Sequence, residues 1–500
     1  MDYLLWSLPL IGILATLLLF RTTALVAGTV GLALAVPVSV FWAPKTLGID
    51  EAVNACTIGA WVGISVGAVL LGGLFFRRAV YDSLPAPQEL ESPPATDKRR
   101  TAFRACFLLG PFAESATGYG VGQLVIAPVL GRLGLKPTEV AVLGLFSQIL
   151  VPWGALANGT IVGAQFAGVQ SSNLGLHSAI ISLPLLLAWL ALFWRIAAAA
   201  GIKGSSASYV SEAAYVVVLV LLLASLSYTL GPEVAGMAAL GIVISVSFAL
   251  TNGLTKKAVR STLPTVLPFV CLIVVLIAVR AVPGLNALAK TFEVRPTSDA
   301  PPLYLFLHPA FWLFAIGSGL FVVRNGWRVL ARNFAAVWTA GKRSLFSIIA
   351  FLAISQILSA SGMAEGLADG LKALLGPAAI LIVPLLGGVF GYITSASSVS
   401  NGLLMHSQVT LAGNEAGKII WIAAIQNVAA AALTMVSPVR LALISHLAGT
   451  DERGVLRKVW PLALAPLVIL SAVAGWVVLS SGSASIFHGA QIRHIVAYSR

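Results

Sequence analysis

Two charged residues of this chain stand inside stretches of apolar and small residues. Glu114 lies in the run Gly110–Gly120, and Arg440 lies two residues after Pro438. A carboxyl group buried in such surroundings has a raised pKa, so Glu114 is expected to carry a proton near neutral pH. The alternative is that Glu114 caps backbone N–H groups of a bend, and one side chain can do both. The guanidinium of Arg440 suits a carboxylate ligand, unless it snorkels to the inner membrane surface.

A second group of polar residues lies in the apolar segment around 394–402, where hydroxyls and one amide cluster. If helices begin here, their free N–H groups and partial positive charge attract an anion. Carbonyl and hydroxyl oxygens could equally coordinate a cation. The alternative is close helix packing through small residues. Packing motifs space small residues by four, however, and this cluster does not.

Two further apolar stretches are interrupted by proline, at Val151–Gly154 and at Ser437-Pro438. Irregular backbone at membrane depth is tolerated only where it is buried in protein or lines a cavity. The breaks are therefore candidate ligand sites, although a lone Asn or Gln also serves to hold helices together. The polar residues around them are Gln148, Asn158, Thr160, Gln426, Asn427, Thr434 and Ser437.

The composition places these residues in a membrane. The chain has 500 residues, of which 58% are hydrophobic and 10% charged, whereas soluble proteins carry about 25% charged residues. An ordinary soluble enzyme, a disordered protein and a nucleic-acid-binding domain are thereby excluded, and an all-α polytopic membrane protein is expected. The three cysteines fall in apolar stretches, and neither metal-ligand spacing of histidines nor a phosphate loop is present. No disulfide framework, metal or other cofactor is therefore expected.

Apolar runs of about 20 residues predict about 12 spanning helices. They lie near 4–20, 22–42, 52–76, 138–168, 176–194, 209–230, 233–251, 262–282, 303–323, 344–360, 416–448 and 459–480. Two more stretches, about 102–132 and about 376–411, are apolar at both ends and broken in the middle by Gly, Pro, Ser and Thr. We expect these two to be re-entrant hairpins.

The basic residues orient the chain, because loops rich in Lys and Arg face the cytoplasm. Two re-entrant hairpins put Arg132 and Lys136 inside, together with the later basic loops. If residues 102–132 crossed the membrane instead, Arg132 and Lys136 would lie outside. The basic loops that follow would then no longer all fall on the inner side. This topology leaves the N-terminus outside and makes 81–104 a cytoplasmic linker. It also places nearly all of the net charge of +13 on the inner side.

The same topology divides the chain into two halves of opposite direction. Residues 1–200 form a first repeat with a hairpin, 201–257 a connecting helix pair, 258–482 a second repeat with a hairpin, and 483–500 a C-terminal tail. Inverted repeats with broken helices are typical of secondary transporters.

The run Pro111–Gly120 resembles the signature of the lactate permease family, Leu-Glu-Gly-Ala-Ala-Gly-Phe-Gly. The segments Gly131–Pro137, Gly388–Asn401 and Met435–Pro438 are similar to further motifs of that family, in the same order. The resemblance implies uptake of lactate or glycolate with protons across the bacterial inner membrane, by the inverted-repeat fold of the larger ion-transporter superfamily. By position in the motifs, the resemblance implies that the family's functional positions correspond here to Glu114, Gly118, Gly120, Thr394, Ser400, Asn401, Ser437 and Pro438.

The chain departs from the family pattern at charged positions. The family's Asp in the second polar run is Ser397 here, and its Gly-Lys pair before Met-Ile-Ser-Pro is Leu433-Thr434. Arg440 stands where the pattern has Ser and is a candidate replacement for the missing Lys. These departures leave the transported acid and the coupling ion open.

Together these observations predict a secondary transporter, not an enzyme, that imports a small monocarboxylate with protons by alternating access. Sodium coupling to another small organic anion is the alternative. A channel or a membrane-embedded enzyme acting on lipid is less favoured, and a homodimer would suit the superfamily. Glu114 is the predicted proton-coupling residue. The predicted substrate-binding residues are Ser115, Thr117, Gly118, Gly120, Gln148, Asn158, Thr394, Ser395, Ser397, Ser398, Ser400, Asn401, Asn427, Ser437 and Arg440.

Overall fold

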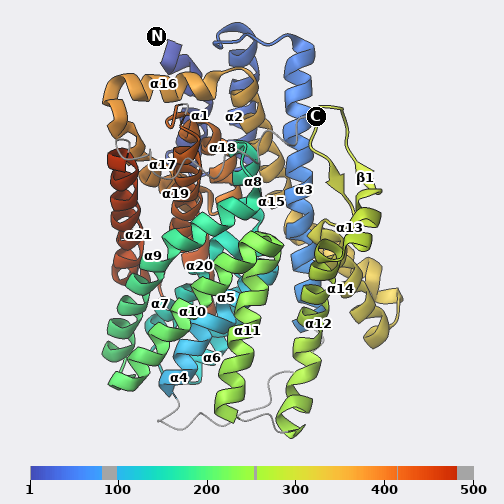
Figure 1. Cartoon of the computed structure of the whole chain (residues 1–500), viewed down its shortest axis with the longest axis vertical. Coiled ribbons are helices and arrows are strands. Elements are labelled where there is room, and N and C mark those ends of the chain that lie inside the picture. The colour runs from blue at the N-terminus through green and yellow to red at the C-terminus, as the bar shows by residue number, and fades with distance from the viewer. Residues whose placement is uncertain (1, 82–97, 253–255, 414, 481–500) are drawn as a thin grey trace.

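The computed structural model describes residues 2–81, 98–252, 256–413 and 415–480, and most of them are helical (Figure 1). The first part of the chain forms α1 (Asp2–Leu18), α2 (Ala24–Phe41), α3 (Ile49–Tyr81), α4 (Lys98–Arg104), η2 (Ala105–Leu109), α5 (Gly110–Thr117), α6 (Val121–Gly131), α7 (Pro137–Gly144), η3 (Leu145–Gln148), η4 (Val151–Trp153), α8 (Gly154–Ala167) and α9 (Ser171–Ala199). The middle forms α10 (Ser206–Leu230), α11 (Pro232–Asn252), α12 (Lys256–Ala281), α13 (Pro283–Lys290) and the antiparallel strands β1 (Glu293–Val294) and β2 (Leu303–Tyr304). The last part forms α14 (Pro309–Asn325), α15 (Arg328–Ala360), α16 (Met363–Leu375), η5 (Gly376–Ile382), α17 (Val383–Thr394), α18 (Ser397–Thr410), α19 (Ala416–Thr434), α20 (Pro438–Ala448) and α21 (Glu452–Leu479).

Nine helices of the described residues are long and apolar enough to cross a membrane, and eleven if each of two bent pairs is one span. The bent pairs are Pro137–Gln148 with Val151–Ala167, at 54°, and Val266–Ala281 with Pro283–Lys290, at 87°. Helices α1 and α14 are apolar but have 17 residues each, about 25 Å against a hydrocarbon core of about 30 Å. The all-α, multi-pass membrane class is thus confirmed, and the expected count of about twelve spans is not.

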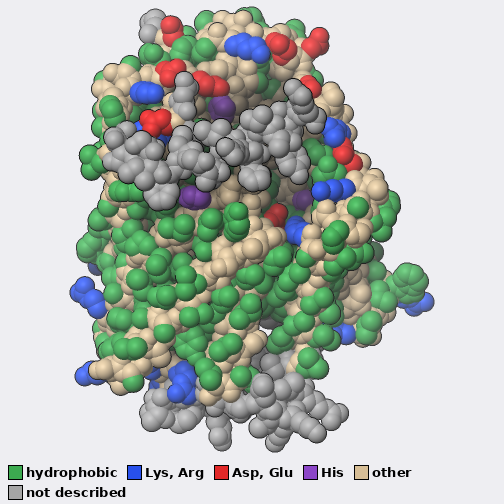
Figure 2. Space-filling model, viewed as in Figure 1, with side chains coloured by type: hydrophobic (Ala, Val, Ile, Leu, Met, Phe, Trp, Pro, Cys, Tyr) green, Lys and Arg blue, Asp and Glu red, His purple; other side chains and the backbone are tan. Residues whose placement is uncertain are grey.

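The surface has the polarity of a membrane protein. Figure 2 shows hydrophobic side chains covering the middle of the visible face. Asp and Glu side chains gather towards the end that carries α16, whereas the charged side chains visible at the end that carries α4 are Lys or Arg. An apolar belt between two charged ends is what a bilayer requires.

Two helix pairs turn back inside the bundle, and we call them hairpin 1 (98–131) and hairpin 2 (376–410). In hairpin 1, α5 and α6 join through Gly118, Tyr119 and Gly120, all with positive φ, at 72°, 55° and 89°. In hairpin 2, α17 and α18 join at Ser395, with φ of 56°. The returning helices α6 and α18 have 11 and 14 residues, about 16 and 21 Å, too short to cross the hydrocarbon core.

Hairpin 1 starts with α4 at one end of the bundle, and hairpin 2 starts beside α16 at the other end (Figure 1). The interruptions expected in the two long apolar runs are both present, between α7 and α8 and between α19 and α20. Most of the linker expected at 81–104 and all of the tail expected at 483–500 lie outside the described residues. The proposed division into repeats stays a prediction.

The long helices α3 and α15 pack closely along their length. Glycines of α3 allow this approach: a Cβ atom on Gly59 would come within 2.5 Å of the Cα of Ala353, and one on Gly63 within 2.6 Å of the Cα of Ile349. Small residues let helix backbones pack in a membrane, where no hydrophobic effect drives helices together. The two helices therefore form a closely packed wall beside the hairpins, and α3 also contacts α5 and α8.

Replacing Gly59 by alanine is expected to destabilise the protein by about 1–3 kcal/mol, because the added methyl group meets backbone atoms that cannot move aside. Thermal unfolding in detergent measures the effect. The matched control is Gly319→Ala on α14, where no atom lies within 4 Å of the added Cβ. Equal melting temperatures for the two variants would contradict the tight α3–α15 contact.

Candidate functional site

A small cavity lies where the bends of the two hairpins meet the two broken helices. Its volume is about 30 Å³, enough for one or two water molecules. Hairpin 1 contributes Glu114, Gly118 and Tyr119, and hairpin 2 contributes Ser395, Ala396, Ser397 and Ser398. The segment from η4 into α8 contributes Val151, Gly154, Ala155, Asn158 and Gly159, and the segment from α19 into α20 contributes Thr434 and Arg440.

Glu114 caps the start of α6 from inside the bundle. Its side chain is buried, and both carboxylate oxygens accept from the N–H of Gly120 at 3.1 Å. Oε2 also accepts from the N–H of Gly122 at 3.1 Å. The first N–H groups of a helix have no partner within that helix, so the carboxylate supplies what the bend leaves unsatisfied. The capping role considered for Glu114 is therefore present.

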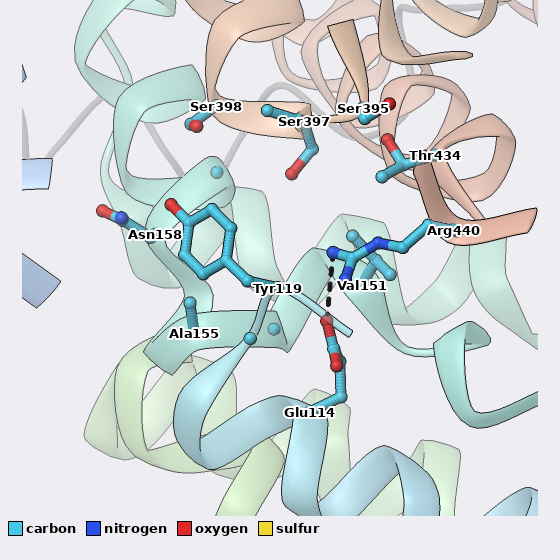
Figure 3. A pocket seen from close by; sticks show the side chains of 14 residues that line it. Glu114, Tyr119, Val151, Ala155, Asn158, Ser395, Ser397, Ser398, Thr434 and Arg440 are labelled. Atoms are coloured by element: carbon cyan, nitrogen blue, oxygen red, sulfur yellow. Dashed lines mark ion pairs between the residues drawn. The ribbon is translucent and has the colours of Figure 1, made fainter. Parts of the chain in front are cut away.

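Arg440 pairs with Glu114 on one side of the cavity (Figure 3). Nη2 of Arg440 lies 3.3 Å from Oε1 of Glu114, and the two side chains are 6% and 3% exposed. Arg440 thus points into the protein and does not snorkel to the membrane surface. A Cβ atom on Gly120 would lie 2.6 Å from Nη1, so the guanidinium occupies the space that this glycine leaves. Nε of Arg440 has no hydrogen-bond partner among the described residues.

The bend of hairpin 2 forms the opposite side of the cavity. Ser397 and Ser398 stand in the first turn of α18, whose first N–H groups are unpaired within the helix. The hydroxyl of Ser395 is buried without a partner among the described residues. Gly159 of α8 has no room for a Cβ atom, because that atom would overlap the hydroxyl of Ser397. Free N–H groups and hydroxyls at a helix start suit an anion.

Asn401 and Asn427 form a buried amide network behind the cavity. The amide of Asn401 donates to the carbonyl of Gly159 at 2.9 Å and to Oδ1 of Asn427 at 2.8 Å. Asn427 in turn donates to the hydroxyls of Thr160 and Ser178, each at 3.0 Å. These bonds join hairpin 2 to α8, α19 and α9, so they hold the bends in place and do not line the cavity.

The predicted substrate residues thus divide into two groups. Gly118, Asn158, Ser395, Ser397, Ser398 and Arg440 line the cavity together with Glu114. The others are Ser115, Thr117, Gly120, Gln148, Thr394, Ser400, Asn401, Asn427 and Ser437, and they lie outside its lining. Several have internal partners, as when Thr117 donates to Ala113 O at 2.7 Å and Ser400 to Gly387 O at 2.9 Å.

Tyr119 and Thr434 line the cavity but are not among the predicted substrate-binding residues. Tyr119 stands between two glycines of the first motif, and Thr434 stands beside the second break. Thr434 was already among the polar residues named at that break, and Tyr119 could have been selected as a polar group at an interrupted helix. Val151 and Ala155 carried no such signal, because apolar residues fill both of their segments.

Backbone strain collects around the same cavity. Six described non-glycine residues have positive φ, and Tyr119, Ala155 and Ser395 among them line the cavity. Leu156 and Ala157 extend the left-handed turn at the start of α8, with φ of 55° and 57°. Non-glycine residues in this region cost about 1–3 kcal/mol each and cluster at functional sites. The strain is a second observation, independent of charge, that marks this cavity as the candidate site.

Arg440→Leu is expected to destabilise the protein by about 3–5 kcal/mol, because it leaves the buried carboxylate of Glu114 without a counter-charge. The double variant with Glu114→Gln is expected to lose less, since the unpaired charge is then removed. Unfolding in detergent measures both. Arg457→Leu, on the exposed surface of α21, is the control, and an Arg440→Leu loss no larger than that of the control would contradict a tight buried pair.

Comparison with known proteins agrees with the motifs. The sequence model of the L-lactate permease family matches residues 2–297 and 303–480, so it includes both hairpins and both broken helices. A curated relative from Streptococcus iniae, an L-lactate permease, is 22% identical over 454 residues, covering 83% of this chain and 92% of the relative. The resemblance expected from the sequence is thereby confirmed, and it supports a transporter. The chain belongs to the L-lactate permease family.

Proposed function

We propose that this protein is a symporter that imports a small monocarboxylate, such as lactate or glycolate, together with protons. The observation that carries the proposal is the buried pair of Glu114 and Arg440 in the cavity between the hairpin bends. A charged pair inside a membrane protein is costly and marks a transport pathway or a proton relay. The family match supports lactate as the acid to test first.

Arg440 is the proposed partner of the substrate carboxylate. It is the cation among the cavity-lining residues, which suits a single carboxylate. Its Nε is unpartnered in the described structure, so a donor is free for the anion. The family's Lys position is Thr434 here, and Thr434 lines the same cavity as Arg440. This supports the idea that Arg440 replaces the missing lysine within one site.

Competition for Arg440 is the proposed coupling step. A substrate carboxylate that binds Arg440 leaves Glu114 without its counter-charge. A buried carboxylate without a counter-charge is unfavourable, so Glu114 then takes up a proton. Release of substrate and proton on the other side restores the pair. Binding of the anion and binding of the proton therefore favour each other, as symport requires.

Alternating access is the proposed route across the membrane, with the two hairpins re-entrant from opposite sides in an inverted repeat. The opposite placement of hairpins 1 and 2 supports this arrangement. The cavity of about 30 Å³ is too small for a molecule with six non-hydrogen atoms. The hairpins and broken helices would move against a scaffold made by the opening spans of each half. The proposed setting is the bacterial inner membrane, with the protein as a homodimer.

Counterflow in proteoliposomes tests the function. Labelled lactate, glycolate and other short acids are offered with and without a pH gradient and with and without sodium. Lactate or glycolate is expected to accumulate when the outside is more acidic. Failure of every acid to accumulate under either gradient would refute the transport of organic acids. Accumulation that follows sodium and ignores pH would assign the coupling to sodium.

Glu114→Gln is expected to abolish uptake driven by the pH gradient while exchange of internal for external substrate continues. Exchange needs no net proton movement, whereas driven uptake needs a group that binds and releases the proton. Glu365→Gln, at a carboxylate on α16 outside the cavity, is the matched control and keeps driven uptake. Unchanged driven uptake in Glu114→Gln would remove its proposed role.

Cysteine labelling tests the proposed orientation. The α6–α7 turn lies beside the α20–α21 turn, since the hydroxyls of Thr138 and Thr450 are 3.1 Å apart. We expect cysteines at Lys136 and Thr450 to react with a membrane-impermeant reagent only from the inside, and a cysteine at Glu51 only from the outside. Labelling of Lys136→Cys from the outside would refute a re-entrant hairpin 1.

A further inference from the structure

A groove between α10 and α11 plays no part in the proposed transport. Its volume is about 270 Å³, against about 30 Å³ for the cavity at the hairpin bends. An apolar cavity of about 150 Å³ already holds a benzene ring. One face of each helix lines the groove, because the lining residues recur every three or four positions. The apolar lining includes Ala214, Val218 and Leu222 on α10 and Val243, Val246 and Leu250 on α11.

The rim of the groove is apolar and exposed. Val218, Ile242 and Val246 are 48%, 45% and 49% exposed, and Leu250 is 75% exposed. In a membrane the neighbours of such side chains are lipid chains, which are as apolar as leucine. A groove without an occupant forfeits the van der Waals contacts of its lining. A hydrocarbon chain therefore suits this groove.

The length of the groove matches one leaflet of a bilayer. The lining runs from Ser211 to Leu222 along α10, which is about 17 Å at the helical rise per residue. Half of the hydrocarbon core is about 15 Å. Beneath the groove the ring of Tyr215, which belongs to the lining, packs against Phe103 of α4, with ring centroids 6.1 Å apart.

Helix α4 holds α10 and α11 at one end of the groove. Arg99 donates through Nε and Nη2 to the two carboxylate oxygens of Glu212 on α10, at 2.8 and 2.7 Å. Arg104 donates through Nε and Nη2 to the hydroxyl and the carbonyl of Ser247 on α11, both at 2.9 Å. The two helices are thus each bonded to α4, which stands between them, so the groove is fixed by specific contacts.

Positive charge gathers at this end of the groove. Residues 98–104 include four basic residues and no acidic one. Arg100 and Arg104 are four positions apart, so they lie on one face of α4, and Arg104 contacts α11 directly after Val246 of the lining. Arg100 is exposed and lies one turn nearer the end of the bundle. Basic pockets between membrane helices bind anionic lipid head groups.

We propose that the groove between α10 and α11 binds one acyl chain of an anionic phospholipid, whose phosphate lies against Arg100 and Arg104. The site is separate from the cavity at the hairpin bends and does not rest on the proposed function. Because α4 begins hairpin 1, the bound lipid joins α10 and α11 to the start of that hairpin. A ligand that binds only the folded protein also stabilises it.

Native mass spectrometry of the protein in detergent tests the head-group contact. The protein is titrated with phosphatidylglycerol, which is anionic, and with phosphatidylcholine, which has no net charge, both with the same acyl chains. The first phosphatidylglycerol is expected to bind at least about fivefold more tightly. Arg100→Gln is expected to remove about fivefold of this affinity and to leave phosphatidylcholine unchanged. Arg457→Gln, on the exposed surface of α21, removes the same charge elsewhere and is expected to change neither.

A substitution in the groove tests the acyl-chain contact in the same titration. Val218→Trp places an indole in the groove and is expected to weaken the first phosphatidylglycerol by at least about tenfold, because the chain loses its space. Leu221→Trp is the matched control on α10, since Leu221 is 61% exposed and is not part of the lining. Both positions are exposed, so neither variant disturbs the core.

Three results would overturn the proposal. Equal affinity for the two lipids in the unaltered protein would do so without need of any variant. Equal effects of Val218→Trp and Leu221→Trp would show that the chain lies elsewhere. A lipid-free dimer that Val218→Trp converts to monomers would assign the groove to a second copy of the chain. None of these measurements depends on whether the protein transports lactate.

Discussion

The buried pair of Glu114 and Arg440 is the interaction on which the rest of the site depends. Inside a membrane bundle no bulk water balances a charge, so each ion must find its partners in the protein. Glu114 meets this need twice, since it accepts from the N–H groups of Gly120 and Gly122 and pairs with Arg440. A single carboxylate thereby caps a helix, closes a hairpin and fixes a cation 326 positions later in the chain.

The pair also explains why the glycines of the first bend stand where they do. The turn of positive φ at Gly118–Gly120 directs the start of α6 back at Glu114, and Gly120 leaves room for the guanidinium. Hairpin 2, on the other side of the cavity, is held by neutral groups instead of charges. Its Asn401 donates hydrogen bonds to the carbonyl of Gly159 and to the side chain of Asn427. The charged pair therefore lies on one side of the cavity, and a hydrogen-bonded amide network outside the lining supports the bend on the other side.

The residues at which the sequence departs from the family motifs lie together in the structure. Ser397, Thr434 and Arg440 are far apart in the sequence, yet all three line one cavity of about 30 Å³. By the resemblance to the family motifs, Thr434 stands at a Lys position, Arg440 at a Ser position and Ser397 at an Asp position. Since charge balance in a membrane site is local, such exchanges can preserve the chemistry of a site while changing which residue performs it.

The sequence by itself determined the membrane class, the two interrupted segments and the two intramembrane charges, because bilayers exclude charge and broken backbone wherever protein does not cover it. The breaks near Val151 and Pro438 and the bend at Gly118 follow from local chemistry, which proline and glycine dictate without help from distant residues. The family could likewise be predicted from short motifs, because each motif is a local run of residues that can be read without knowing the tertiary structure.

Only the tertiary structure decided which of these residues meet. Arg440 had two sequence interpretations of equal standing, and its direction depends on the space that Gly120 leaves on another helix. Thr117, Thr394 and Ser400 have the side chains of a binding site, but their hydroxyls donate to nearby carbonyls. Tyr119 entered the cavity through an unusual backbone angle that its residue type does not favour. Composition and spacing report the environment of a residue, whereas partners and directions depend on long-range packing between helices.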